Sequence, residues 1–281
     1  MIVISNRNEI RNKVNMLIAK SKSIGFVPTM GALHQGHLTL VEQAKHENDY
    51  VVVSIFVNPT QFNNKEDLNK YPRDTDADLE KLDSVGCDFV FLPAVDEMYP
   101  RDETLRKYDF GSLTHVMEGK NRPGHFDGVA TIVHKLFEAI PATRAYFGKK
   151  DYQQLLVIKS LVKQLRLNIE IRPCNIVREA DGLAMSSRNQ RLTKEQRKVA
   201  PVIYQTLQKA VKMASNTSPD EIKAFVMSEI NKVTEMKLEY FEMANADSFQ
   251  PIIHFEKNKN IMGFIVVNLG AIRLIDNIQF F

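Results

Sequence analysis

The sequence has no apolar run close to the roughly 18 residues that a membrane-spanning helix requires. It shows no internal repeat, and its only low-complexity stretch is the short polar segment 215–218. The first residues, 1–6, lack the basic region and the apolar stretch of a secretory signal. These absences exclude a membrane protein and predict a cytoplasmic, globular one.

An excess of one charge sign is also missing. Thirty-seven Lys and Arg stand against 34 Asp and Glu, for a formal charge of +3, and the two signs are interspersed. We therefore expect no nucleic-acid partner. Cysteine is scarce, and Cys87 and Cys174 lie far apart without a Cys neighbour, which argues against a disulfide framework or a structural zinc site. Both are predicted to be buried free thiols.

Short β-rich runs alternate with helical patterns in the first two thirds of the chain. Ile24–Pro28 precedes a helical pattern at Leu38–Glu47, and Arg144–Phe147 precedes another at Tyr152–Leu165. At 281 residues with 44% hydrophobic content, the chain can build one large domain or two modest ones. The alternation predicts an α/β fold over residues 1–176, a Rossmann-like parallel sheet flanked by helices.

The pattern changes near residue 177. Two long helical patterns, 194–214 and 219–234, come before three β-type runs with no helix between them. The runs are Leu238–Met243, Met262–Leu269 and Ile272–Ile275. Consecutive strands of this kind predict a second, smaller α+β domain over residues 177–281.

The segment Pro28–His37 directly follows the first of these predicted strands and leads into an amphipathic helix. It carries Gly31 and an H-x-G-H pattern, in which His34 and His37 are three residues apart and can face one ligand. Backbone N–H groups and the positive end of a helix dipole attract an anion. The segment therefore predicts a phosphate site.

Polar segments also follow three other predicted strands, Tyr50–Val57, Arg144–Phe147 and Ile169–Pro173. The polar segments are Asn58–Phe62, Gly148–Gln154 and Val177–Asn189. Ligands collect at the carboxyl ends of the strands of a parallel sheet, so we expect these segments to converge with Pro28–His37 on one face.

Together these segments resemble the pantoate–β-alanine ligase family, and the resemblance covers roughly the first 190 residues. It is carried by Pro28–His37, Ser54–Phe62, Tyr71–Arg73, Arg122–Phe126, Gly148–Gln154 and Arg178–Asn189. The resemblance implies that ATP activates pantoate as pantoyl adenylate, that β-alanine then displaces AMP to give pantothenate, and that pyrophosphate is released. It also implies Mg²⁺ and a homodimer.

The resemblance further implies the site residues. The catalytic residues would be His37, His34 and Lys150. The ATP-binding residues would be Met30, Gly31, Ala32, Leu33, His34, Gln35, Gly36, His37, Gly148, Lys149, Lys150, Asp151, Val177, Met185, Ser186, Ser187 and Arg188. Pantoate would contact Gln61 and Gln154, and β-alanine would contact Gln61 and Asn58. Asp78 is the candidate magnesium ligand, next to Ala77, where similar sequences often carry an acidic residue.

The residue types suit this chemistry. Ser186–Arg188 resembles the K-M-S-K-S phosphate loop of class I aminoacyl-tRNA synthetases, and two hydroxyls with a guanidinium suit phosphates. Neutral glutamines orient a carboxylate without drawing charge from the oxygen that must attack phosphorus. His37 can donate a proton, as the resemblance implies, or only stabilise charge. His125, in a glycine-flanked loop, is expected to close over the site.

Two other functions remain open at this point. One is an H-x-G-H nucleotidyltransferase that adenylates or cytidylylates a phosphorylated acceptor, although such an enzyme needs cations for the acceptor phosphate. The other is a regulatory nucleotide-binding module without catalysis, which would have little need of both histidines, Lys150 and the serine pair.

Overall fold

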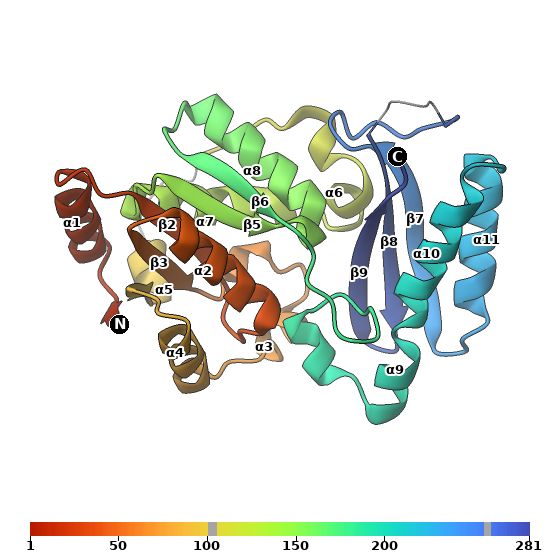
Figure 1. The fold of residues 1–281 in the computed structure, drawn as a ribbon, viewed down its shortest axis with the longest axis horizontal. Helices are drawn as coiled ribbons and strands as arrows, with labels where there is room; N and C mark the ends of the chain where they lie inside the picture. The colour runs from red at the N-terminus through yellow and green to blue at the C-terminus, as the bar shows by residue number, and fades with distance from the viewer. Residues whose placement is uncertain (101–105, 256–259) are drawn as a thin grey trace. The chain divides into compact units, whose positions relative to one another are not determined.

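The structure is a computed structural model that describes residues 1–100, 106–255 and 260–281 (Figure 1). Contacts within the chain divide it into a first unit, Met1–Asn175, and a second unit, Ile176–Phe281. The first is a six-stranded parallel sheet with helices on both faces, and the second contains a three-stranded antiparallel sheet. The predicted fold class is confirmed. None of the helices in the described ranges has both the length and the apolar character needed to cross a membrane.

The first unit contains most of the elements. Its strands are β1 (Ile2–Ile4), β2 (Ile24–Thr29), β3 (Tyr50–Ile55), β4 (Phe89–Phe91), β5 (Arg144–Gly148) and β6 (Glu170–Cys174). Its α-helices are α1 (Arg7–Ile18), α2 (Gln35–Glu47), α3 (Lys65–Asn69), α4 (Thr75–Ser84), α5 (Val95–Met98), α6 (Met117–Asn121), α7 (His125–Ala139) and α8 (Tyr152–Leu165). Three short 3₁₀ helices are η1 (Pro59–Gln61), η2 (Gly111–Thr114) and η3 (Lys149–Asp151).

The strand order of the first unit determines where a ligand can bind. The order is β1-β4-β3-β2-β5-β6, so the chain runs outward from β2 through β3 to β4 and later outward again from β5 to β6. The direction reverses between β2 and β5, which pair only at Gly25–Arg144 and Phe26–Ala145. Such a reversal is the usual ligand site of an open parallel sheet. The segments that follow β2 and β5 are therefore placed to form a site.

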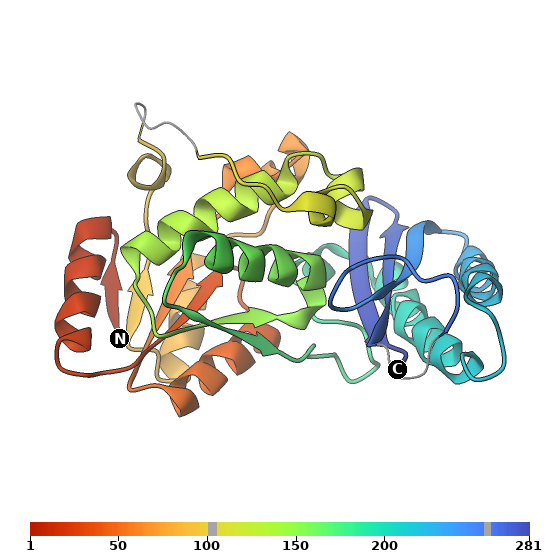
Figure 2. The same cartoon turned by 90° about the horizontal axis from the view of Figure 1, so that it is seen from above.

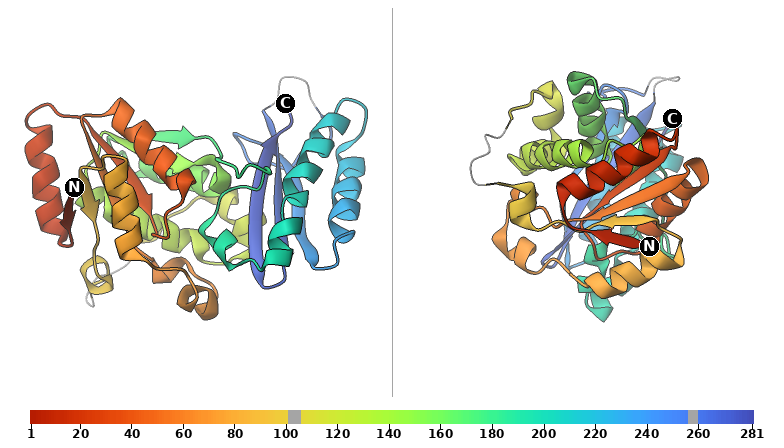
Figure 3. Two further views of the ribbon diagram at one scale, coloured as in Figure 1. Left: turned by 60° about the horizontal axis from the view of Figure 1, so that its bottom comes forward. Right: turned by 90° about the vertical axis from the view of Figure 1, so that its left-hand side faces the viewer.

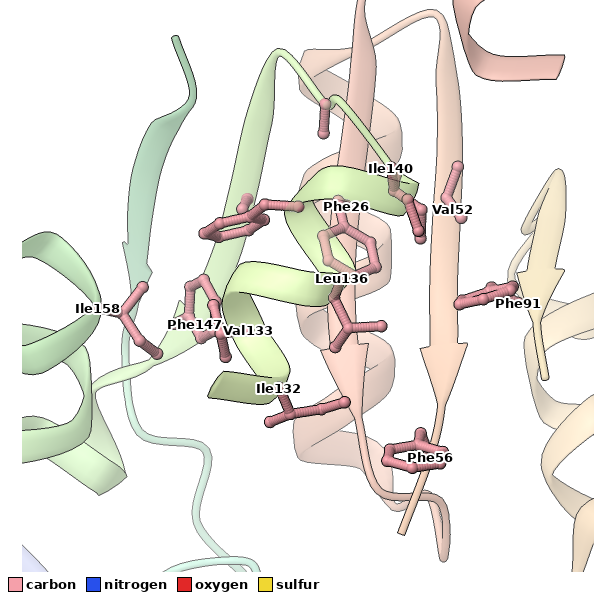
Figure 4. Packing of buried hydrophobic residues seen from close by; sticks show 14 of the residues in the cluster. Phe26, Val52, Phe56, Phe91, Ile132, Val133, Leu136, Ile140, Phe147 and Ile158 are labelled. Atoms are coloured by element: carbon pink, nitrogen blue, oxygen red, sulfur yellow. The ribbon is translucent and has the colours of Figure 1, made fainter. Parts of the chain in front are cut away.

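Alternation along the strands divides the core into two layers. Phe26 and Val52 pack with residues of α1, α7 and α8, whereas their neighbours Val27 and Val53 pack with residues of α2 and α4. Figure 2 shows α7 and α8 on one side of the sheet and α2 on the other. In Figure 4, Leu136 of α7 lies beside Phe26 in the first of these layers. These layers hold the strand ends in fixed positions.

The second unit is smaller and built differently. It contains η4 (Ser187–Arg191), α9 (Lys194–Val199), α10 (Val202–Met213), α11 (Pro219–Asn231), β7 (Met236–Asn245), β8 (Ile261–Leu269) and β9 (Ile272–Gln279). The strands pair antiparallel in the order β7-β8-β9. Helices α10 and α11 lie side by side along one face of this sheet (Figure 3). Their apolar residues close the core of the unit.

Two local features differ from the sequence prediction. The single helix predicted over 194–214 is divided into α9 and α10 at Ala200–Pro201, because Pro201 has no N–H to continue the helix of α9. Elements β1 and α1 were not predicted. Strand β1 has only three residues, and α1 buries only Ile10 and Val14, so neither gives a strong apolar period.

Candidate active site

A tight turn joins β2 to α2 in the first unit. Gly31 has φ +79° and Ala32 has φ +50°, in the left-handed region that favours glycine. A Cβ at position 31 would lie only 3.0 Å from Asp78 Oδ2 and 3.1 Å from Ile55 Cγ2. The turn therefore requires Gly31 both for its backbone angle and for the close approach of Asp78.

A buried carboxylate holds this turn in place. Asp78 of α4 is 1% exposed, and it accepts hydrogen bonds from the N–H of Ala32 at 2.8 Å and of Leu33 at 2.7 Å. One turn later on α4, Lys81 Nζ donates to the carbonyl of Leu33 at 2.9 Å. Both oxygens of Asp78, the candidate magnesium ligand, are thus bonded to the backbone. Within the described ranges, no three His, Cys, Asp or Glu side chains are grouped so as to hold a metal ion.

The two histidines cap α2 reciprocally. His34 Nδ1 accepts from the N–H of Gly36 at 3.1 Å, and His37 Nδ1 accepts from the N–H of His34 at 3.3 Å. Since an accepting nitrogen carries no proton, each neutral ring has its proton on Nε2. The ring centroids are 4.0 Å apart. The pair therefore presents two imidazole Nε2–H groups.

Many of the backbone N–H groups that were expected to receive the anion have acceptors within the protein. Hydrogen bonds within the protein already engage six backbone N–H groups of the segment Pro28–His37, those of Gly31, Ala32, Leu33, His34, Gly36 and His37. Asp78 and the two imidazoles accept four of these bonds, and Thr29 Oγ1 and the carbonyl of His34 accept the other two. The donors that this segment offers to an anion are therefore mainly on side chains.

Both imidazoles are neutral at neutral pH. Burial, and then the nearby charges of Lys150 and Lys81, lower the pKa of His34 to about 4. Burial lowers the pKa of His37 well below its usual value, and His34 and Lys150 add to the effect. A neutral imidazole is a poor proton donor, but its N–H still donates a hydrogen bond. This favours charge stabilisation over proton donation for His37.

The charge of Lys150 lowers the pKa of both imidazoles, which shows that Lys150 lies near them. It belongs to η3, directly after β5, and its Nζ is 3.3 Å from Asp151 Oδ2. The adjacent Lys149 donates to Asn175 Oδ1 at 2.8 Å. Gln154 is half-buried in the first turn of α8. The structure therefore brings together His34, His37 and Lys150, the three predicted catalytic residues.

Asn58 organises the segment that follows β3. It is 1% exposed, and its Nδ2 donates to the carbonyl of Gly128 and to Gln61 Oε1, both at 3.1 Å. Its Oδ1 accepts from the hydroxyl of Tyr99 at 2.7 Å and from that of Thr60 at 3.0 Å. Both ends of the Asn58 amide are thus bonded inside the protein.

Gln61 is held by its backbone as well as by its side chain. Its Nε2 donates to Met30 Sδ at 2.9 Å, and its carbonyl accepts from His125 Nδ1 at 2.9 Å. Arg122, which can only donate, lies 3.1 Å from His125 Nε2, so the proton of His125 is on Nδ1. His125 is 6% exposed. It is an anchor for Gln61 rather than the closing group that we expected from the sequence.

The remaining predicted residues lie in the second unit. The N–H of Met185 donates to the carbonyl of Val177 at 3.0 Å, and Ser186 Oγ caps η4 by accepting from the N–H of Arg188 at 3.3 Å. Ser187 is buried. The structure thus gathers Val177, Met185 and the Ser186–Arg188 segment within this unit.

Sequence reasoning missed three residues that support these segments. Arg178, which precedes the Ser186–Arg188 segment in the predicted stretch Val177–Asn189, makes a bidentate ion pair with Asp276 of β9 at 2.6 and 2.9 Å. Lys81 could have been found, because it lies three residues after Asp78 on the same helix face. Tyr99 gave no signal, because it lies 41 residues from its partner Asn58.

Comparisons with known proteins agree over the full chain. The family model described as pantoate-beta-alanine ligase matches residues 2–279. The pantothenate synthetase of Bacteroides fragilis (strain YCH46) is 47% identical over 280 residues, covering 100% of this chain and 99% of the relative. That of Phocaeicola vulgatus is 49% identical over 281 residues, with the same coverage.

Solved structures give the same result. The crystal structure of pantothenate synthetase from Thermus thermophilus has a TM-score of 0.93 and 41% identity, and each chain is fully covered. The pantoate-beta-alanine ligase of Francisella tularensis was crystallised with beta-gamma ATP and beta-alanine. It has a TM-score of 0.83 and 38% identity, covering 99% of this chain and 97% of that one.

Proposed function

Because this chain belongs to the pantoate–β-alanine ligase family, we propose that it joins pantoate to β-alanine at the expense of ATP, through an enzyme-bound pantoyl adenylate. The observation that carries the proposal is the pair of neutral imidazoles beside Lys150, at the point where the strand order reverses. A charged ligand at this point meets N–H donors and one ammonium group.

The first step is attack of a pantoate carboxylate oxygen on the α-phosphorus of ATP. The new P–O bond forms as the bond to pyrophosphate breaks, and negative charge grows on the phosphates. The Nε2–H groups of His34 and His37 and the ammonium of Lys150 stabilise that charge in fixed positions, so no reorganisation is needed during the reaction. The low pKa of both imidazoles favours this role for His37 over proton donation.

The second step joins the two acids. The unprotonated amine of β-alanine attacks the acyl carbon of the adenylate and the C–N bond forms. AMP leaves with the electron pair of the broken C–O bond, and the nitrogen releases one proton to solvent. Activation must come first, because an amine does not displace the oxygen of a free carboxylate at a useful rate.

Gln61 and Gln154 are assigned to pantoate in this proposal. Gln61 Nε2 now donates to Met30 Sδ, a weak acceptor that a carboxylate oxygen would replace favourably. Gln61 also remains the candidate contact for β-alanine. Asn58 acts indirectly, because its amide is fully bonded to protein groups.

The rest of the ATP site follows the family. We assign nucleotide contacts to Met30–His37, Gly148–Asp151, Val177 and Met185, and assign the β- and γ-phosphates to Ser186–Arg188. Mg²⁺ enters with ATP as part of the substrate, as is common for this ion. We assign Asp78 the role of holding the turn after β2 and do not assign it to Mg²⁺, because both of its oxygens accept backbone hydrogen bonds.

Two broader assignments also belong to the proposal. We place the enzyme in the cytoplasm and expect a homodimer, both on the basis of the family. Cell fractionation tests the first. Light scattering coupled to size-exclusion chromatography tests the second, and a monomer at micromolar concentration would refute it.

Exchange of labelled pyrophosphate into ATP is the test of the proposed reaction. With purified protein, Mg²⁺ and ATP, exchange should require pantoate but not β-alanine. Addition of β-alanine should convert the system to net release of AMP. Exchange that is absent until β-alanine is added would refute the adenylate intermediate, and no pyrophosphate release under any condition would refute the ligase function.

A further inference from the structure

The Gln61 side chain can present either of two chemically opposite groups to a ligand. Its Nε2 can donate hydrogen bonds, whereas its Oε1 can only accept them. A carboxylate is an acceptor, so it requires the Nε2 end. A rotation of the amide by half a turn would place Oε1 against an anionic oxygen and would repel it.

The structure fixes this choice through Asn58. The carbonyl of Gly128 can only accept, so the group of Asn58 that faces it at 3.1 Å must be Nδ2. The second hydrogen of Nδ2 then points to Gln61 Oε1, also at 3.1 Å. With Oε1 held as an acceptor, the donor end of Gln61 is directed away, to Met30 Sδ.

Tyr99 completes the arrangement from the other end. Its hydroxyl lies 2.7 Å from Asn58 Oδ1 and 3.1 Å from Thr60 Oγ1, and Thr60 Oγ1 lies 3.0 Å from the same Oδ1. These hydroxyls supply donors to Oδ1 and stabilise the one orientation of Asn58 that suits Gln61. The Tyr99 ring is fixed in turn, with Phe56 at 6.3 Å between centroids and Lys135 Nζ at 5.4 Å from the ring centroid.

We propose that Tyr99 is a positioning residue that, through Asn58, holds the Gln61 amide with its donor end toward pantoate. The inference rests on the proposed function, because it takes Gln61 as the pantoate ligand. Tyr99 directly follows α5 and lies outside the stretches of sequence that carry the family resemblance, although its hydroxyl contacts one of them at Asn58 and Thr60.

Tyr99→Phe is the test, because it removes the hydroxyl and keeps the ring. The matched control is Tyr108→Phe, which removes a hydroxyl bonded to His134 Nδ1 at 2.8 Å elsewhere in the first unit. One neutral hydrogen bond contributes about 1 kcal/mol, which is about a fivefold change in binding. For Tyr99→Phe we therefore expect the KM for pantoate to rise about fivefold, with the KM for ATP within twofold of the parent value. Tyr108→Phe should change neither constant.

A second background shows whether Tyr99 acts through Gln61. In Gln61→Ala, the side chain that Tyr99 orients is missing, so adding Tyr99→Phe should leave the KM for pantoate unchanged. An unchanged KM for pantoate in the single variant would overturn the proposal. So would an equal effect of Tyr99→Phe in both backgrounds, because a general structural role predicts that result.

NMR separates this inference from the proposed reaction. The side-chain amide signals of Asn58 and Gln61 should differ from those of exposed amides in the ligand-free protein, and Tyr99→Phe should shift both toward exposed values. Tyr108→Phe should not move them. If the amide signals respond as expected but pantoate has no effect on the exchange of pyrophosphate into ATP, the proposed function fails, while the orientation of the Gln61 amide by Tyr99 through Asn58 stands. If the signals do not move, the positioning role is wrong whatever the activity.

Discussion

The segments after β2 and β3 follow adjacent strands, and each is anchored by one buried polar side chain. Asp78 holds the first and Asn58 holds the second, and both side chains are 1% exposed. A carboxylate only accepts, and here Asp78 fixes two backbone N–H groups. An amide donates and accepts, so Asn58 transmits an orientation to Gln61. The charged anchor fixes backbone shape, and the neutral anchor fixes the polarity of a side chain.

The difference also suits the ligand that we assign to each segment. The charge of Asp78 is balanced by two N–H donors and by Lys81 one turn away, so it is shielded from a nearby phosphate. A second carboxylate in place of Asn58 would lie beside the pantoate pocket and repel the substrate acid. Four sets of substitutions test this comparison, from the largest expected effect to the smallest.

Asp78→Asn should have the largest effect, and the effect should be on stability. The amide NH₂ would face one of the two backbone N–H groups, leaving that donor buried and unpaired and removing a charge-assisted bond. We expect the free energy of unfolding to fall by about 3 kcal/mol, measured by urea denaturation. Asp76→Asn, an exposed change on the same helix, is the control and should cost well below 1 kcal/mol. Equal losses in the two variants would show that Asp78 does not anchor the turn.

His34→Ala and His37→Ala should act on rate. Loss of one fixed donor to the developing phosphate charge should slow adenylate formation ~10²-fold or more, about 2.7 kcal/mol of transition-state stabilisation. ATP affinity should change less, as single-turnover rates and equilibrium binding would show. His46→Ala, at the exposed end of α2, is the matched control. If a variant loses ATP binding and thermal stability together while its folded fraction keeps full activity, the histidines only cap α2 and do not stabilise the transition state.

Substitutions of Gln61 test the segment after β3, which the neutral side chain of Asn58 anchors. Gln61→Glu places an anion beside the pantoate carboxylate, and the KM for pantoate should rise about tenfold or more with ATP binding nearly unchanged. Gln61→Lys should bind pantoate at least as well but adenylate it more slowly, because the ion pair stabilises the ground-state carboxylate more than the transition state. Single-turnover adenylation at saturating pantoate measures this. A rate equal to that of the parent would place Gln61 away from the reacting carboxylate.

The smallest expected effect is on the pH dependence of the free energy of unfolding. Burial, together with Arg122, lowers the pKa of His125 to about 4, compared with an unfolded value near 6.5. The unfolded state therefore binds more protons between these values, and the stability that neutral His125 provides is lost as pH falls from about 6.5 toward 4. The loss between pH 7.5 and pH 6 should be about 0.8 kcal/mol for this group. His125→Gln should flatten the pH dependence of unfolding by that amount, and an unchanged slope would contradict the assigned pKa.

The sheet and the candidate phosphate segment were predictable because their signals are local. Short apolar runs mark β2 and β3, and Gly31 with His34 and His37 lies within seven residues of the chain. The anchors were not predictable, since Asp78 reaches Ala32 across 46 positions and Tyr99 reaches Asn58 across 41. For the same reason, the sequence could not show that backbone donors of the segment are used internally. Whether these donors are used internally depends on which helix packs against the turn.

Strands β2 and β5 are central in the sheet, yet their ladder covers only Gly25–Arg144 and Phe26–Ala145. Beyond those pairs, up to Thr29 and Gly148, each strand lacks a ladder partner on the side that faces the other. The sheet therefore contains an internal edge, with the hydrogen-bonding capacity that proteins usually cover at their outer strands. The segments that carry the candidate site, Met30–His37 and Gly148–Asp151, begin where this pairing has ended. The two central strands thus separate before they end, and the candidate site starts at their separated ends.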